Sequence, residues 1–247
     1  MSNDAMRGAL WAIERRWLRQ PHSPCREYVF VEVQPSRLAE RLATVMAVDE
    51  REVMGRLERG CRAFAWDWRG EVVSWLWVST GQEWAPPLRR CLHFPDGDCH
   101  GWGAGTLADH RGHGLFASLL GYAAWRMARE GCPTMWTGVL DSNLASQRGH
   151  LAAGFRPVLR LAAYHQPPPT RVLAWPADYT DEQLVARARC LLGDDALHIT
   201  DSRSRADVSA WTRERARELA RSTTEHITTG LPQTDGRLAA GAGSGAR

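Results

Sequence analysis

The stretch TLADHRGHGLF, residues 106–116, decides the fold of this 247-residue chain. It joins a predicted strand over residues 98–107 to a predicted helix over residues 112–130, whose apolar residues recur at helical spacing. Gly112 and Gly114 let the backbone approach a ligand closely, and the N–H groups that begin a helix are unpaired and lie at the positive end of its dipole. The segment therefore predicts a pyrophosphate site, to which Arg111 adds positive charge.

Other phosphate-binding motifs do not fit this stretch. The chain contains no lysine, so the G-x-x-x-x-G-K-[ST] loop is absent, and the glycine spacing is not that of a dinucleotide-binding G-x-G-x-x-G segment. His110 and His113 occupy neighbouring turn positions without a cluster of carboxylates or thiols, which argues against a metal site. No Ser-His-Asp or Cys-His catalytic set is identifiable.

A second motif follows one helix and one strand later. After a predicted strand that ends at Leu140, the chain reads Asn143-Leu144-Ala145-Ser146, then His150, then Gly154-Phe155.

These two motifs, in this order, resemble the acetyl-CoA signature of the GNAT N-acetyltransferases. The first has the form Arg or Gln, x, x, Gly, x, Gly or Ala, and it is matched by Arg111, Gly114 and, imperfectly, Phe116. The second has Asn, a small residue three positions on, Tyr seven on, and Gly-Phe eleven and twelve on. The chain departs from it at His150, which stands where the family has tyrosine. The resemblance covers roughly residues 28–175.

The resemblance implies an α/β fold with a mixed, mostly antiparallel central sheet, splayed between its fourth and fifth strands and flanked by helices. The acyl-CoA would lie in the splay. The implied organisation is an N-terminal helical extension (1–24), a GNAT acyl-CoA-binding domain (25–176), a C-terminal helical extension (177–222) and a disordered tail (223–247).

The resemblance also implies which residues contact acetyl-CoA, the expected co-substrate. Backbone groups around Thr106 and Leu107 would pair with the pantetheine arm, the helix start would hold the pyrophosphate, and Asn143 and Ser146 would flank the cofactor from the other side. The full set is Thr106, Leu107, Arg111, Gly112, His113, Gly114, Leu115, Phe116, Asn143 and Ser146.

Direct attack of an amine on the thioester needs a proton acceptor and a proton donor. His150 is a candidate acid because imidazole titrates near neutrality, although a packed helical histidine is the alternative. His100 and Asp98, on the predicted fourth strand, are the candidate bases, and proton loss through a water chain is the alternative.

The remaining pattern predicts the other elements. An initial helix over residues 4–19 is expected from the spacing of Leu10, Ile13 and Trp17. Residues 61–80 predict a hairpin with an Arg69-Gly70 turn. Its expected common face, either core packing or a wall of the substrate pocket, carries Phe64, Trp66, Trp68, Val73, Trp75 and Trp77.

Residues 81–97 predict a long loop. Further strands are expected at 28–33, 134–140, 155–164 and 171–175, and helices at 35–46, 49–60, 142–153, 181–192 and 206–222.

Composition excludes several classes of protein. A net charge of +3, with arginines spread among acidic residues, gives little support to nucleic-acid binding, and the alternating charges near residues 211–221 predict a solvated helix face. No apolar run is long enough for a membrane span, so we expect a cytoplasmic protein without a membrane partner. The six cysteines form no C-x-x-C pair and are expected to be free thiols.

The sequence therefore favours an N-acetyltransferase that moves an acetyl group from acetyl-CoA to a primary amine of a small molecule, without a metal. Two alternatives stay open: a biosynthetic enzyme that uses another acyl donor, and a non-catalytic CoA-binding regulatory module. A homodimer is possible.

Overall fold

A computed structural model describes residues 5–95, 97–165, 170–178, 181–193 and 196–198. All of them belong to the first of two compact units, residues 1–202. The run Pro167-Pro168-Pro169, which predicts a turn, lies outside the described residues, as do the predicted helix at 206–222 and the predicted tail.

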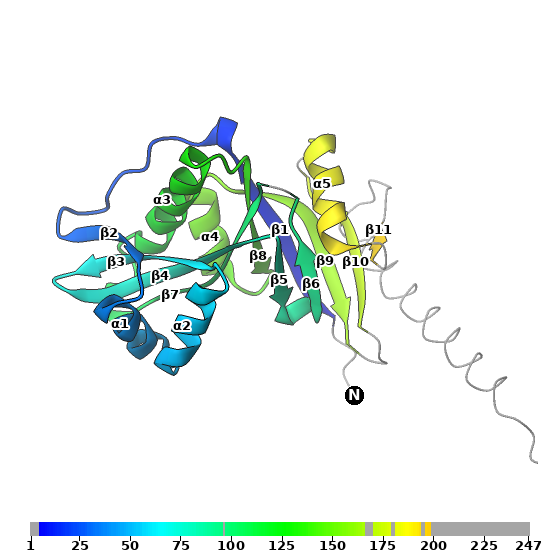
Figure 1. Ribbon diagram of the computed structural model, residues 1–247. Coiled ribbons are helices and arrows are strands. Elements are labelled where there is room, and N and C mark those ends of the chain that lie inside the picture. Colours follow the sequence, from blue (N-terminus) through cyan, green and yellow to red (C-terminus); the bar gives the residue numbers. More distant parts are fainter. Residues whose placement is uncertain (1–4, 96, 166–169, 179–180, 194–195, 199–247) are drawn as a thin grey trace, which may run out of the picture. The chain divides into compact units, whose positions relative to one another are not determined.

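A nine-stranded mixed sheet forms the centre of this unit (Figure 1), in the order β11-β10-β9-β1-β8-β7-β4-β3-β2. Neighbouring strands are antiparallel except for β7 with β8 and β10 with β11. This confirms the predicted fold class. The strands are β1 (Met6–Glu14), β2 (Tyr28–Val33), β3 (Arg62–Trp68), β4 (Glu71–Thr80), β7 (Cys99–Thr106), β8 (Thr134–Leu140), β9 (Arg156–Tyr164), β10 (Arg171–Pro176) and β11 (Leu197–His198).

Helices cover both faces of the sheet. On one face, α3 packs against β3, β4, β7 and α4. On the other, α1 and α2 cover the half of the sheet formed by β3 and β4, and α5 covers the half that contains β9 and β1. The helices are α1 (Arg37–Met46), α2 (Glu50–Glu58), α3 (Leu115–Arg129), α4 (Leu144–Ala152) and α5 (Glu182–Leu192), with short 3₁₀ turns η1 (Arg15–Trp17), η2 (Pro86–Leu88) and η3 (Ala108–His110).

The helix starts follow from capping residues. The Asp49 and Asp181 carboxylates accept hydrogen bonds from the N–H groups of Arg51 and Leu184 and begin α2 and α5. Pro35 does not enter the first turn of α1, because Ser36 is the N-cap and its hydroxyl accepts from the Leu38 N–H.

The N-terminal segment is a strand, so the prediction of a helix over residues 4–19 is wrong. β1 lies between β8 and β9 and pairs antiparallel with both. Its buried run from Ala9 to Ile13 is apolar at every position, a pattern that suits a strand covered on both faces as well as a helix. The segment forms a strand and not a helix because the edges of β8 and β9 need a partner, and β1 pairs with both. The sequence does not show that these two edges lie on either side of β1.

The predicted hairpin of β3 and β4 forms, with Trp68 opposite Glu71, but its predicted common face is wrong. The register shifts between Trp66 and Asp67, so that Val73 is an extra residue on β4. Such a bulge reverses the alternation of side chains beyond it. Trp75 and Trp77 therefore face α1 and α2, while Phe64, Trp66 and Val73 pack on the side of α3.

Residues 81–97 are not simply a loop. They contain a small hairpin of β5 (Gln82–Ala85) and β6 (Arg90–His93), joined by η2. The Phe94 N–H donates to the Gly81 carbonyl and closes the hairpin at its base. Leu88, Leu92 and Phe94 then pack with α5 against the sheet.

Candidate active site

The central strands β7 and β8 separate along their length. They pair at three positions, where Cys99, His100 and Gly101 face Met135, Trp136 and Thr137. β7 also bulges against β4 between Trp102 and Gly105, with Gly103 at φ +58°. Beyond Gly101, β7 continues for five residues without a partner on β8, so the sheet opens there.

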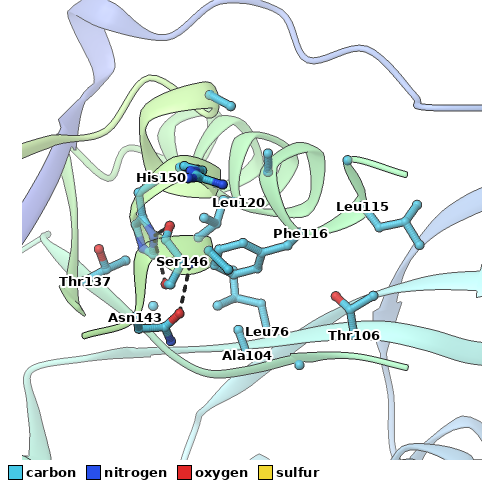
Figure 2. Close-up of a pocket in the computed structure, with 18 of the residues that line it drawn as sticks. Leu76, Ala104, Thr106, Leu115, Phe116, Leu120, Thr137, Asn143, Ser146 and His150 are labelled. Carbon is cyan, nitrogen blue, oxygen red and sulfur yellow. Dashed lines mark hydrogen bonds between the residues drawn. The ribbon is translucent and has the colours of Figure 1, made fainter. Parts of the chain in front are cut away.

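A cleft of about 920 Å³ occupies this opening (Figure 2). β7 forms one wall, β8 and α4 form the other, and the start of α3 lies at one end. Its lining residues include Gly101, Trp102, Gly103, Ala104, Gly105, Thr106, His110, Arg111, Gly112, Gly114, Leu115, Phe116, Thr137, Gly138, Asn143, Ser146, Arg148, Gly149 and His150.

The start of α3 is built to leave its N–H groups free. Gly114 is the N-cap in the left-handed region at φ +74°, and no side chain caps the helix. Gly112 has φ +83°, and a Cβ atom built on either glycine would meet nothing within 4 Å. These glycines therefore serve the backbone conformation and keep the space above the helix start open. Arg111 lies beside them, and its Nε donates to the Thr106 carbonyl at 3.1 Å.

The wall formed by α4 begins with Asn143. Its side-chain oxygen is the N-cap and accepts from the Ser146 N–H at 3.0 Å. This contact fixes both residues at the edge of the cleft, as Figure 2 shows.

His150 lies one turn further along α4 and is only 4% exposed. Its Nδ1 is 2.8 Å from the Ser146 carbonyl oxygen. Since a carbonyl can only accept, Nδ1 carries the proton, and Nε2 of the neutral ring is the acceptor. Burial lowers the pKa of His150 to about 4, so the ring is neutral near pH 7 and holds no proton on Nε2 to donate.

Phe116 fills the space between α3 and α4. Its ring meets His150 edge to face, with centroids 5.4 Å apart. A Cβ atom on Gly149 would lie 2.4 Å from the Phe116 ring, so the bulky residue in the first motif depends on a glycine in the second. The departure at Phe116 is visible in the sequence, whereas its dependence on Gly149 becomes visible only where the two helices meet.

The two predicted bases do not line the cleft. Asp98 is fully buried, with its carboxylate 2.5 Å from the Arg187 guanidinium, and it accepts a hydrogen bond from Trp136 Nε1. His100 stacks on Phe94 toward the hairpin, and burial lowers its pKa to about 4. Both point to the face of the sheet opposite α3.

The backbone groups of one predicted cofactor contact, Leu107, are already used within the protein. The Leu107 N–H donates to the Val73 carbonyl, and the Leu107 carbonyl accepts from the His110 N–H. Leu107 and His113 are not part of the cleft lining. The alternating glycines of β7, Gly101, Gly103 and Gly105, do line it. These glycines are not among the predicted site residues, although their recurrence at every second position over residues 101–105 is a signal that could have found them.

The charge of the cleft is positive. Arg111 and Arg148 line it, and among the described lining residues there is no aspartate or glutamate. Within the part of the chain that the structure describes, no group of His, Cys, Asp and Glu is arranged to hold a metal ion. A second cavity, of about 740 Å³, meets the cleft at Gly114 and is lined by Arg19, His22 and Arg156.

A family model for the acetyltransferase (GNAT) family matches residues 32–155, half of the chain. The chain therefore belongs to the GNAT acetyltransferase family, whose members use acetyl-CoA. None of the curated proteins matches the sequence significantly. Among the described residues, no helix is long and apolar enough to cross a membrane.

Several solved structures are similar to this chain. A GCN5-related N-acetyltransferase from Kribbella flavida is 18% identical over 61% of this chain and 54% of that chain, with a TM-score of 0.44. A GCN5-related N-acetyltransferase from Sphaerobacter thermophilus is 16% identical over 64% and 50%, with a TM-score of 0.49. The yncA protein from Salmonella typhimurium, solved with its cofactor acetyl-CoA, is 17% identical over 53% and 80%, with a TM-score of 0.40. The chain spans about half the length of the first two.

Proposed function

We propose that this chain transfers an acetyl group from acetyl-CoA to a primary amine of a small molecule by direct attack. The observation that carries the proposal is the uncapped, glycine-flanked start of α3 at the end of a cleft between two separated strands. Free N–H groups and the helix dipole favour a pyrophosphate there, and the cleft leads from that point along β7.

The positive charge of the site supports an anionic donor. Arg111 and Arg148 border the cleft, and the adjoining cavity has cationic residues of its own. The pyrophosphate of acetyl-CoA would lie at Gly114, where the two spaces meet. Its acetylated arm would then run between β7 and α4, and its nucleotide would extend into the second cavity.

The transfer itself forms one bond and breaks one. The lone pair of a neutral amine attacks the thioester carbonyl carbon, the C–S bond breaks, and the CoA sulfur leaves as a thiolate that gains a proton. With no carboxylate among the described lining residues, we expect the amine to lose its proton to water. A forming thiolate near His150 would raise the pKa of the imidazole, so that Nε2 could take up a proton from the water that receives the amine proton and pass it to the sulfur.

The cofactor site is tested by calorimetric titration of the chain with acetyl-CoA. The variant Gly114→Val should abolish binding, because it places a side chain over the helix start. Gly60→Val is the matched control: Gly60 also has a positive φ, and its Cβ position is equally open, but it follows α2 and does not line the cleft. Equal loss in both variants, or no binding by the intact chain, would contradict the proposal.

The role of His150 is tested by comparing His150→Tyr with His150→Phe in a CoA-release assay against a panel of amines. If His150 donates a proton, tyrosine should retain turnover and phenylalanine should lower kcat by about 10²-fold or more. Equal activity of the two variants would remove His150 from the chemistry.

A non-catalytic CoA-binding module is the second candidate. The observations that favour it are the neutral, buried His150 and the positions of Asp98 and His100 outside the cleft. Tight binding of acetyl-CoA without CoA release for any amine would support it, and turnover of any amine would exclude it.

A further inference from the structure

Two buried thiols meet at the closed end of the splayed sheet. The sulfur atoms of Cys99 and Cys132 are 3.1 Å apart, and both residues belong to the core beneath α3. Cys99 is the first residue of β7, and Cys132 lies in the turn between α3 and β8. Both are free cysteines.

The backbone holds each thiol in place. Cys99 pairs with Thr80 on β4 and with Met135 on β8. The Cys132 N–H donates to the Met127 carbonyl at 3.1 Å, which ties the turn to the end of α3. A disulfide needs the two sulfurs to approach to about 2.05 Å, so bond formation requires about 1 Å of movement.

We propose that Cys99 and Cys132 are an oxidation site and form an intramolecular disulfide with a small-molecule disulfide as the oxidant. The Cys132 thiolate attacks one sulfur of the oxidant, forms a mixed disulfide and releases one small thiol. The Cys99 thiol then loses its proton and attacks the Cys132 sulfur, which releases the second small thiol. Two protein thiols are oxidised and one small disulfide is reduced to two thiols.

The two cysteines differ in a way that assigns these roles. Cys132 is 7% exposed, whereas Cys99 is fully buried. Contact with Cys99 lowers the pKa of the Cys132 thiol, while contact with Cys132 and burial raise the pKa of Cys99. Because Cys132 is the more accessible of the two thiols, it reacts first, and Cys99 then resolves the mixed disulfide.

The cross-link would close a loop around one functional unit. Residues 99–132 contain the whole of β7, the segment with Gly112 and Gly114, and the whole of α3. The bond lies at the end where β7 and β8 remain paired, away from the open part of the cleft. Oxidation should therefore restrict the unfolded chain and raise the Tm by about 5–10 °C. This inference does not depend on which ligand occupies the cleft.

The test is incubation of the folded, full-length chain with oxidised glutathione, followed by intact mass measurement, peptide mapping and thermal unfolding. We expect loss of two hydrogen atoms, a peptide that joins Cys99 to Cys132, and the higher Tm, all reversed by a reducing agent. A linked peptide that forms only in denaturant, or reaction confined to Cys25, Cys91 and Cys190, which are exposed, would overturn the proposal.

Single variants separate the two roles. Cys99→Ala should stop at a mixed disulfide between glutathione and Cys132, and Cys132→Ala should leave Cys99 unreacted. Cys61→Ala is the matched control, because Cys61 is also buried but packs in the cluster beneath α1 and α2. It should still form the Cys99–Cys132 bond; failure to do so would contradict the assignment.

Discussion

At the scale of single residues, the contact between α3 and α4 depends on a large side chain on one helix packing against a glycine on the other. Phe116 fills the space that Gly149 leaves, and His150 lies against the same ring. His150 is further enclosed by Trp11 and Phe155. Burying a neutral histidine and placing a glycine inside a helix both lower the stability of the fold. Both residues are explained by the Phe116 ring, which packs against His150 and occupies the space beside Gly149.

Gly149→Ala should lower the free energy of unfolding by about 1–3 kcal/mol, because the new methyl group overlaps the Phe116 ring. Chemical denaturation measures this loss. Gly55→Ala in α2 is the matched control, since its Cβ would meet only the end of the Arg59 side chain at 3.8 Å, and it should be neutral or stabilising. Adding Phe116→Ala to Gly149→Ala should make the two effects less than additive; strict additivity would show that the side chains do not compete for space.

Stability should fall on acidification because of His100 and His150. Burial lowers the pKa of both to about 4, whereas an unfolded histidine titrates near its ordinary value. The unfolded chain therefore binds more protons between pH 6.5 and 4, and stability present above pH 6.5 is lost as the pH falls toward 4. Each histidine should contribute a loss of about 2 kcal/mol at pH 5 relative to pH 7. Denaturant titrations at both pH values measure this loss. If the free energy of unfolding of His100→Gln falls between pH 7 and pH 5 by as much as that of the unchanged chain, His100 does not contribute to the loss.

At the scale of elements, a buried ion pair attaches α5 to the sheet. Asp98 precedes β7, is fully buried and contacts Arg187 of α5 and Trp136 of β8. A carboxylate enclosed in this way is stable only while its partners remain. Asp98 therefore has a structural explanation for its burial that does not involve catalysis.

Arg187→Met should destabilise the protein by about 2–3 kcal/mol, because it leaves the Asp98 charge uncompensated while the partly exposed position of Arg187 admits some water. Thermal and denaturant unfolding measure the loss. Arg16→Met is the control: its ion pair with Asp181 also joins a distant segment to α5 but lies at the surface, so no measurable change is expected. Equal effects of the two variants would contradict the importance of burial.

At the scale of the whole molecule, the N-terminal strand completes the sheet. β1 is about 120 residues from its partner β8 along the chain, yet it lies between β8 and β9 and pairs with both. Gly8 is required in this position, because a Cβ atom there would lie 2.6 Å from the Val139 carbonyl oxygen. The strand also supplies Trp11, whose ring lies against His150.

Removal of residues 1–14 should therefore abolish cooperative folding, because this segment is part of the sheet and not a dispensable extension. Without β1, the edges of β8 and β9 lose their partner and a continuous apolar run leaves the core. Circular dichroism and gel filtration of the truncated chain test this expectation. Removal of residues 223–247, predicted to be a tail, is the control and should leave the Tm and acetyl-CoA binding unchanged. A folded chain without β1 would refute the interpretation.

Much of the site was predictable from the sequence because its chemistry is local. Gly112 and Gly114 set the backbone conformation of one helix start, Arg111 lies beside them, and the Asn143 side chain caps the next helix, α4. Such features depend on neighbours a few residues away, which a sequence displays directly. The hairpin turn at Arg69-Gly70 and the types of the elements from β2 to α5, apart from the β5–β6 hairpin and the short 3₁₀ turns, follow for the same reason.

The errors concern contacts between distant segments. The apolar spacing of Leu10, Ile13 and Trp17 fits a helix, and only the two strand edges that β1 bridges make it a strand. One extra residue at Val73 turns Trp75 and Trp77 to the opposite face, which no count of alternating residues reveals. In the sequence, Asp98 and His100 are reasonable candidates for a base. In the folded protein, α5 covers Asp98 and the residue after the β5–β6 hairpin, Phe94, covers His100. The sequence by itself thus determined the family and the position of the glycine-flanked helix start at the cleft, since both depend on short-range patterns. Only the tertiary structure decided which polar side chains reach the cleft and which are buried elsewhere, because burial and register arise from segments that meet only after the chain has folded.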